Sequence, residues 1–317
     1  MTGIICGTGS FAPAKVMDNN DLAKLVDTND EWIRERTGVV QRHIIENDTT
    51  VTMAVRAAEE AIKNAGILPE EIELIILSTL SSNLIMPCAA CEVQKAIGAV
   101  NATCFDMNAA CSGFIFAYNT ANAYIESGLY KTVLVIGSES LSNLTDWTDR
   151  GTCILFGDGS GAVVLKAGET KSYKAVTHSD GSRGEALTCI SRYAIKDDSD
   201  NGLMKMNGRE VFNFAVKKVP EVINEVLEKN NVNIEDIDYF ILHQANKRIV
   251  ESVAKRLKAD ISKFPMNMME YGNTSSASIP ILIDEMRKNG ELRKGQKLVM
   301  AGFGAGLSWG ASIFEWN

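Results

Sequence analysis

Apolar runs alternate with amphipathic segments along the whole chain. The runs IELIILS (72–78) and VLVIG (133–137) are typical of buried strands. The segment AVRAAEEAIKNAGILPEE (54–71) has the periodicity of an amphipathic helix that ends in a short acidic turn. Strand-like and helix-like segments in alternation predict an α/β fold.

The pattern also repeats within the chain. IELIILS (72–78) aligns with IDYFILH (237–243), and VLVIG (133–137) aligns with LVMAG (298–302), in both cases 165 positions later. Long-range self-similarity of this kind indicates duplicated structural units. We therefore expect two copies of one α/β unit, related by a pseudo-twofold axis.

The two units would be residues 1–168 and 169–317, and both end in glycine-rich sequence. We expect a strand pair in each: ILFGDGSGAVVLKA (154–167), with a hairpin at Asp-Gly, and FGAGLSWGASIFEW (303–316). The offset falls to 149 here, so the first unit carries about 16 extra residues, roughly 140–154. A polar insertion of this length between core elements favours a functional segment.

Cys111 is the first candidate for chemistry. It stands in NAACSGF, between a strand-like run and a helix-like run, so it would begin a helix. The helix dipole and unpaired backbone N–H groups at that position favour a thiolate nucleophile. The alternative is a small buried side chain, which is the commoner role of free cysteine.

His243 and Asn273 are its candidate partners. His243 ends the apolar run FILH, where α/β sheets place their ligands, although it could equally be a structural histidine. Asn273 lies in GNTSSAS (272–278), which aligns with ACSGFIF (110–116) at an offset of 162 and so pairs Asn273 with Cys111. Its default role would be to cap a helix.

Composition limits the classes of partner. The net charge is −8, which argues against bulk binding of nucleic acid or anionic membranes. There is no signal-like start and no membrane-length apolar run, and the seven cysteines are scattered. We therefore expect a cytoplasmic protein with reduced thiols and no metal site. The segment 247–258 nevertheless predicts an amphipathic helix with a basic outer face. This face either binds an anionic partner or is an ordinary solvated helix surface.

Five motifs together resemble one family across essentially the whole chain. They are DEWIRERTGV (30–39), DMNAACSGF (106–114), ILHQAN (241–246), YGNTSSASIP (271–280) and GFGAGLSWG (302–310). The chain is similar to the 3-oxoacyl-[acyl-carrier-protein] synthase III family of the thiolase superfamily. This resemblance implies a five-layered αβαβα fold, a homodimer, acyl-CoA and malonyl-acyl carrier protein as substrates, and no cofactor.

The resemblance also implies roles for individual residues. Cys111, His243 and Asn273 would form the catalytic triad, and the backbone N–H groups of Cys111 and Ala305 would form the oxyanion hole. The remaining roles fall into three groups, namely coenzyme A binding (Thr28, Trp32, Arg36, Arg150), the acyl pocket (Met86) and carrier-protein binding (Lys247, Arg248, Lys255, Arg256). The implied reaction is an initiating condensation through acyl-Cys111, and the primer acyl group stays open.

Relatives with other chemistry would differ at specific positions. Elongating ketosynthases use two histidines, but this chain has Asn273 at the position of the second histidine. Degradative thiolases need a second cysteine in the late glycine-rich turn, and GFGAG contains none. A hydroxymethylglutaryl-CoA synthase would need a catalytic glutamate at a matching turn. A condensing enzyme of secondary metabolism, an acyl-CoA cysteine hydrolase and an inert scaffold remain as alternatives.

Overall fold

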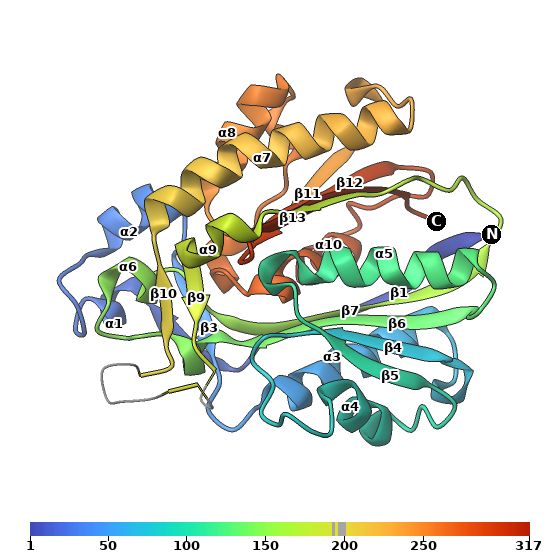
Figure 1. The fold of residues 1–317 in the computed structure, drawn as a ribbon, viewed down its shortest axis with the longest axis horizontal. Coiled ribbons are helices and arrows are strands. Elements are labelled where there is room, and N and C mark those ends of the chain that lie inside the picture. Colours follow the sequence, from blue (N-terminus) through green and yellow to red (C-terminus); the bar gives the residue numbers. More distant parts are fainter. Residues whose placement is uncertain (192–193, 196–200) are drawn as a thin grey trace.

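Two mixed sheets form the frame of the molecule in a computed structural model (Figure 1), which describes residues 1–191, 194–195 and 201–317. The first sheet has the order β1-β7-β6-β4-β5 and comprises Thr2–Phe11, Asp158–Gly168, Thr132–Ser140, Leu74–Ser78 and Thr103–Met107. The second has the order β11-β12-β13-β8 and comprises Tyr239–Leu242, Lys297–Gly304, Ser308–Glu315 and Val176–Ser179. In the first sheet β6, β4 and β5 are parallel, and β7 and β1 continue it in antiparallel pairs. In the second sheet only β11 and β12 are parallel, and β13 and β8 continue it in antiparallel pairs.

Helices alternate with the sheets to give five layers. In Figure 1, α3 and α4 lie below the first sheet, α5 and α10 lie between the sheets, and α7 and α8 cover the second sheet. These helices are Thr50–Ala65, Ala89–Ile97, Gly113–Glu126, Ser278–Lys288, Gly208–Lys229 and Lys247–Leu257. Side chains of α5 and α10 share one buried cluster with strands of both sheets, as the largely apolar sequence of α5 requires. The predicted α/β thiolase-like architecture is therefore confirmed.

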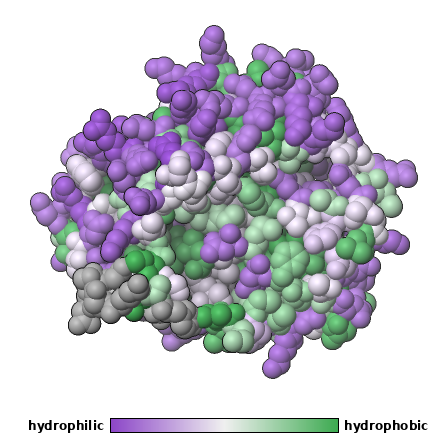
Figure 2. Space-filling view, viewed as in Figure 1, coloured by the Kyte–Doolittle hydropathy of each residue, from purple (hydrophilic) through white to green (hydrophobic). Residues whose placement is uncertain are grey.

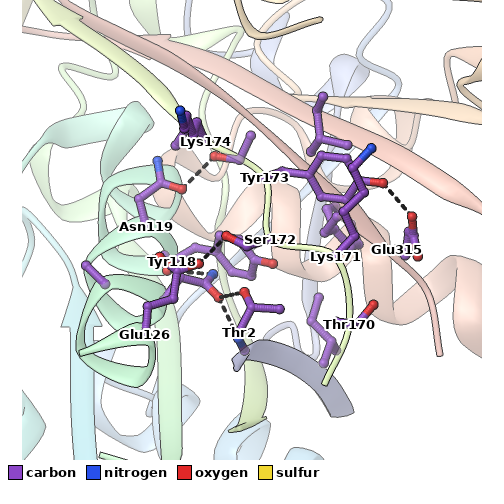
Figure 3. A pocket seen from close by; sticks show the side chains of 18 of the residues that line it. Thr2, Tyr118, Asn119, Glu126, Thr170, Lys171, Ser172, Tyr173, Lys174 and Glu315 are labelled. Atoms are coloured by element: carbon purple, nitrogen blue, oxygen red, sulfur yellow. Dashed lines mark hydrogen bonds between the residues drawn. The ribbon is translucent and has the colours of Figure 1, made fainter. Parts of the chain in front are cut away.

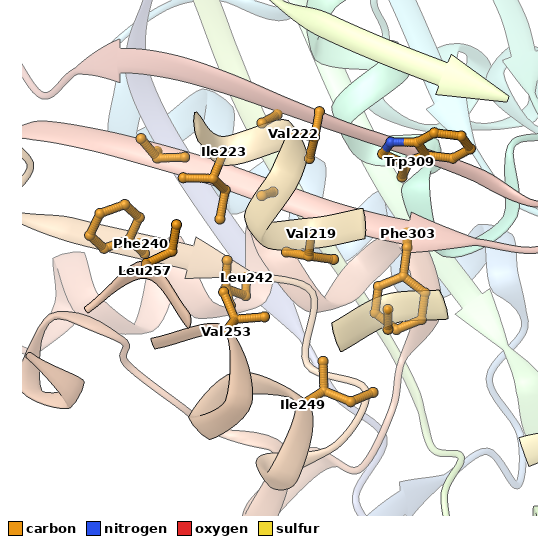
Figure 4. Packing of buried hydrophobic residues seen from close by; sticks show 14 of the residues in the cluster. Val219, Val222, Ile223, Phe240, Leu242, Ile249, Val253, Leu257, Phe303 and Trp309 are labelled. Atoms are coloured by element: carbon orange, nitrogen blue, oxygen red, sulfur yellow. The ribbon is translucent and has the colours of Figure 1, made fainter. Parts of the chain in front are cut away.

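The outer layer over the second sheet shows how the amphipathic pattern is used. Figure 4 shows Val219, Val222 and Ile223 of α7 facing strands β11 to β13, with α8 packed beside them. The buried residues of α8 are those of the predicted apolar face, namely Ile249, Val250, Val253, Ala254 and Leu257. The basic side chains of α8 are consequently left on the outer surface.

At the turn that holds Cys111, the two halves of the chain match at the same offset of 165 residues. This match corrects one of the sequence alignments. Two 3-10 turns, η2 (Ala110–Ser112) and η7 (Ser275–Ala277), precede α5 and α10. Their first residues both have positive φ, 46° at Ala110 and 50° at Ser275, and these residues are again 165 positions apart. The offset of 162 was therefore wrong by three residues: Cys111 corresponds to Ser276, and the counterpart of Asn273 is Asn108.

The glycine-rich segments also differ from expectation. The second segment forms the expected hairpin of β12 and β13, but the first does not, because Asp158 and Gly159 lie inside β7. Asp158 instead turns its carboxylate toward the 140–154 insertion, where Ser142 N and Ser142 Oγ donate to it at 2.8 and 2.5 Å. The Asp-Gly pair thus anchors the insertion and does not form a turn.

Smaller elements surround the site. They are the strand pairs β2/β3 and β9/β10 (Lys15–Asp18, Gln41–Ile44, Leu187–Cys189, Met204–Met206), the short helices α1, α2, α6 and α9 (Asn19–Leu22, Asp30–Thr37, Arg150–Cys153, Met268–Tyr271) and the further 3-10 turns (Pro69–Glu71, Leu141–Leu144, Gly181–Ala186, Ile234–Asp236, Ile261–Lys263). Within the described ranges, no helix is both long and apolar enough to cross a bilayer. The division at residue 168 coincides with the end of β7 but stays a prediction.

Candidate active site

Cys111 lies in the η2 turn at the base of α5 and is only 8% exposed. The end of β12 packs directly on this turn. A Cβ atom at Gly304 would stand 2.7 Å from Cys111 N and 2.9 Å from Ser112 N, so the approach requires glycine. Ser112 Oγ is also 2.6 Å from Ser308 Oγ of β13, which fixes the turn against the second sheet.

Burial governs the acidity of the Cys111 thiol. The thiol lies in an apolar environment that raises its pKa to about 12, and a hydrogen bond with the Ser275 hydroxyl opposes this only in part. The position of Cys111 at a helix start had instead predicted a lowered pKa for the thiol. Loss of hydration outweighs the helix dipole here because Cys111 is almost fully buried.

His243 follows the last residue of β11 and is 3% exposed. Its Nδ1 lies 2.7 Å from Ser278 Oγ, and the same oxygen accepts a hydrogen bond from Gln244 N at 3.3 Å. The Ser278 hydroxyl can donate its own proton to Nδ1, and in that arrangement the imidazole proton lies on Nε2. Burial lowers the pKa of His243 to about 3, so the ring is neutral at physiological pH.

Asn273 lies between α9 and η7, held by its backbone to the end of the insertion. Asn273 N donates to Leu155 O at 2.8 Å, and Gly157 N donates to Asn273 O at 3.1 Å. The side-chain Oδ1 accepts from Ser275 N at 2.8 Å. This bond fixes the amide so that its NH₂ group is the part left to act as a donor.

One cavity of about 430 Å³ brings the three predicted residues together. Cys111, His243 and Asn273 all line it, from three different segments of the chain. A second, apolar cavity of about 50 Å³ is also lined by Cys111 and shares Phe156 and Leu187 with the first. Its other lining residues include Leu80, Leu141, Met204, Ser275 and Ala305. Cys111 thus stands between a wide channel and a small apolar chamber.

The residues expected to bind coenzyme A gather at the mouth of the channel. Trp32 and Arg36 of α2 line it, whereas Arg150, from the insertion, does not line it but lies beside the Trp32 ring. The guanidinium carbons of Arg36 and Arg150 lie 5.7 and 5.0 Å from the centre of the Trp32 ring. Thr28 is nearby in sequence but does not line the channel, and its hydroxyl is buried without a hydrogen-bond partner.

The other predicted residues divide into two groups. Arg248 lines the channel, with its guanidinium carbon 5.4 Å from the ring centre of Phe212, whereas Lys247, Lys255 and Arg256 are exposed on α8 away from it. Met86 lines neither cavity and is 83% exposed.

Sequence reasoning missed several residues of the site. Ser278 lies within the motif YGNTSSASIP but was not singled out, and Arg209 and Phe212 lie outside every quoted motif. Arg209 is the second residue of α7 and comes shortly after β10, which is a weak indication of a binding residue. The described residues contain no group of three or more His, Cys, Asp or Glu side chains placed to hold a metal ion.

Comparison with known proteins identifies the family. The family model for 3-oxoacyl-[acyl-carrier-protein] synthase III matches residues 105–181, and its C-terminal model matches residues 227–316. A beta-ketoacyl-[acyl-carrier-protein] synthase III from Clostridium acetobutylicum is 51% identical over 319 residues, which cover 99% of this chain and 98% of that protein. This chain belongs to the synthase III family.

Solved structures agree with this assignment. The synthase III of Aquifex aeolicus VF5 superposes with a TM-score of 0.94 at 44% identity, covering 99% of this chain and 100% of that one. The priming beta-ketosynthase of the R1128 polyketide pathway gives a TM-score of 0.96 at 33% identity, covering 99% and 96%. The synthase III fold is thus shared by a priming ketosynthase of a polyketide pathway.

A third cavity, of about 230 Å³, lies away from this synthase III site, beside the two termini (Figure 3). It is lined by polar side chains of α5, the 170–175 segment and β13, which bond mainly to one another. Ser312 Oγ donates to Asn119 Oδ1 at 2.6 Å, and Tyr173 donates to Glu315. None of the predicted catalytic residues lies there, so the candidate active site is the channel at Cys111.

Proposed function

We propose that this protein is an initiating condensing enzyme of bacterial fatty acid synthesis. It transfers the acyl group of an acyl-CoA primer to Cys111 and then condenses it with malonyl-acyl carrier protein, releasing carbon dioxide. The observation that carries the proposal is the convergence of Cys111, His243 and Asn273 on one channel, with an apolar chamber beyond the sulfur. No metal or redox cofactor takes part.

The first half-reaction uses Cys111 and backbone donors. The sulfur attacks the thioester carbonyl, the carbonyl oxygen becomes an oxyanion, and coenzyme A leaves. We assign the oxyanion hole to the N–H groups of Cys111 and Ala305, which belong to two residues that both line the apolar chamber. Trp32, Arg36 and Arg150 would hold the nucleotide end of coenzyme A at the channel mouth.

The second half-reaction uses His243 and Asn273 as hydrogen-bond donors. Loss of carbon dioxide from the malonyl group leaves an enolate, whose oxygen needs donors that do not protonate the carbon. His243 Nε2–H and the Asn273 NH₂ group fit this requirement because Ser278 and Ser275 N occupy their other polar atoms. The carbanion then attacks the acyl-Cys111 carbonyl and expels the thiolate.

The carrier protein would dock on α8, and the enzyme would act as a homodimer in the cytoplasm. Arg248 lines the channel, and Lys247, Lys255 and Arg256 extend its positive surface outward. The strand β5 is an edge strand, and the exposed side chains of Leu84, Ile85 and Met86 lie on one loop. Figure 2 shows pale and green surface across the middle of the face that α5 crosses in Figure 1, which supports pairing with a second copy that receives Met86.

Intact-mass measurement of the acyl-enzyme tests the proposal. Incubation with acetyl-CoA should add one acetyl group to the protein, and the Cys111→Ser variant should acquire none while keeping its fold. His243→Ala and Asn273→Ala should form the acyl-enzyme but lose malonyl decarboxylation by about 10²–10³-fold. Hydrolysis of acyl-CoA without malonyl consumption would support the hydrolase alternative instead. Condensation with a polyketide-type acceptor but not with malonyl-acyl carrier protein of fatty acid synthesis would favour secondary metabolism.

A further inference from the structure

Glu139 is a buried carboxylate that the steps above leave unused. It lies in β6, is 0% exposed and receives hydrogen bonds from two segments of the chain, 79–81 and 275–276. Its five donors, at 2.7 to 3.2 Å, are Thr79 Oγ1, Leu80 N and Ser81 Oγ on Oε2, and Ser275 Oγ and Ser276 Oγ on Oε1. Such a number of donors stabilises an ionised carboxylate even in an apolar interior.

Ser275 connects this carboxylate to the nucleophile. Its hydroxyl donates to Glu139 Oε1 at 3.1 Å, and Ser275 lines the same apolar chamber as Cys111. The hydroxyl also opposes the rise in the pKa of the Cys111 thiol. The backbone φ of Ser275 is 50°, in the left-handed region that is uncommon for a residue other than glycine. Ser275 thus links the wall of the chamber at Cys111 to the Glu139 carboxylate.

The nucleophile needs such a connection. A thiol with a pKa of about 12 is ionised to only about one part in 10⁵ at pH 7. The negative charge of Glu139 also opposes formation of a thiolate beside it, and burial raises the pKa of Glu139 itself. This enclosed site can hold one negative charge but not two, so Cys111 can lose its proton only if Glu139 accepts it.

We propose that Ser275 and Glu139 form a proton relay for Cys111, in which Glu139 stores the thiol proton between the two half-reactions. The proposal rests on the acyl-transfer function proposed above. In this scheme Ser275 exchanges a proton with the reacting sulfur and is a catalytic residue, whereas Glu139 acts through Ser275.

The protons that the relay takes up and returns balance over one catalytic cycle. As the sulfur attacks the thioester, the Cys111 proton passes to Ser275 Oγ, and the Ser275 proton passes to Glu139 Oε1. The new S–C bond replaces the bond to coenzyme A, whose thiolate leaves and takes a proton from water. In the condensation step the carbanion forms the C–C bond, the S–C bond breaks, and the expelled Cys111 thiolate recovers its proton from Glu139 through Ser275.

Few other groups titrate near this network. Among the described residues that line the chamber, the ionisable ones are Cys111 and Cys189, the latter exposed and on β9. His243, on the channel side, stays neutral above a pH of about 3. The remaining neighbours of Glu139 are the backbone N–H of Leu80 and the hydroxyls of Thr79, Ser81 and Ser276, which do not titrate in the working range.

The rate of Cys111 acylation as a function of pH tests the relay. In the unaltered protein the rate should be nearly constant from pH 6.5 to 9, because Glu139 takes the proton. In Ser275→Ala the rate at pH 7 should fall about 10²-fold and then rise about tenfold per pH unit, since only pre-formed thiolate reacts. A purely structural effect of the substitution would instead lower the rate by the same factor at every pH.

Ser276→Ala is the matched control. Ser276 is as buried as Ser275 and donates to the same Glu139 oxygen at 3.0 Å, but it bonds onward to Ser78 O and is not a hydrogen-bond partner of Cys111. Its acylation rate should stay within about threefold of the unaltered protein with a flat pH profile. Equal losses in both variants, or a loss in Ser275→Ala that does not change with pH, would overturn the relay.

Glu139→Gln offers a second measurement. Glutamine cannot accept the proton, so this variant should show the same pH profile as Ser275→Ala, and the double variant should be no slower than either one. If Glu139→Gln does not fold, the comparison of Ser275→Ala with Ser276→Ala tests the relay by itself. Failure of the unaltered protein to acquire any acyl group would count against the proposed function itself, whereas normal acylation in Ser275→Ala would count only against the relay.

Discussion

Ser278 Oγ lies 2.7 Å from His243 Nδ1 and accepts a hydrogen bond from Gln244 N. When Ser278 donates to Nδ1, the imidazole proton lies on Nε2. A neutral ring with its proton on Nε2 can donate to a developing enolate, whereas the other tautomer would present a lone pair to it. The first residue of α10 thus orients the histidine at the end of β11.

Ser278→Ala should therefore separate the two half-reactions. Without the hydroxyl, His243 loses its tautomer preference, and malonyl decarboxylation should fall about 10- to 10²-fold. Acyl transfer to Cys111 needs no proton from His243 and should change less than threefold, so it serves as the internal control. Quenched-flow mass measurement of both steps gives the comparison, and a parallel loss of both rates would contradict the assigned role.

The small chamber beyond Cys111 predicts the primer length. Its volume of about 50 Å³ and its apolar walls accommodate a short acyl chain, so acetyl- and propionyl-CoA should acylate Cys111 at least tenfold faster than hexanoyl-CoA. Leu141→Ala should enlarge the chamber and reduce this preference. Leu144, in the same turn, does not line the chamber, so Leu144→Ala should leave the preference unchanged. Rates with a panel of acyl-CoAs measure both effects.

The sequence was most informative where a pattern is local. The alternation of strands and helices, the apolar face of α8 and the position of Cys111 before a helix all follow from residues near one another in the chain. The motifs then predicted the joint placement of Cys111, His243 and Asn273, which the structure brings to one channel.

Contacts between distant segments could not be predicted from such local patterns. Ser278 lies 35 positions from His243, and Ser275 lies 136 positions from Glu139, and no periodicity links either pair. Local signals also misled in two places. Asp158-Gly159 looked like a hairpin because turn chemistry is judged from neighbours, and the dipole at the start of α5 suggested an acidic thiol although burial decides its pKa.

Trp32 should contribute to binding but not to chemistry. Its ring centre lies 5.7 and 5.0 Å from the guanidinium carbons of Arg36 and Arg150, and the aromatic ring can stack on the base of a nucleotide. Trp32→Ala should raise the KM for acyl-CoA about 10- to 100-fold with little change in kcat, because stacking on a base contributes about 1–3 kcal/mol. An acyl-pantetheine lacks the nucleotide and is the matched control substrate. A similar rise in KM for both donors would argue against contact with the base.

His243 should also make the stability of the fold depend on pH. Its pKa is about 3 in the folded protein and about 6.5 in an unfolded chain. Below pH 6.5 the unfolded state therefore binds a proton that the folded state refuses, and this contribution to stability is lost as pH falls toward 3. From pH 7 to pH 5 the free energy of unfolding should decrease by about 2 kcal/mol more in the unaltered protein than in His243→Gln. Urea unfolding at the two pH values measures the difference, in which His43 and His178 cancel because both proteins retain them. An equal change in the two proteins would show that His243 is not held neutral by burial.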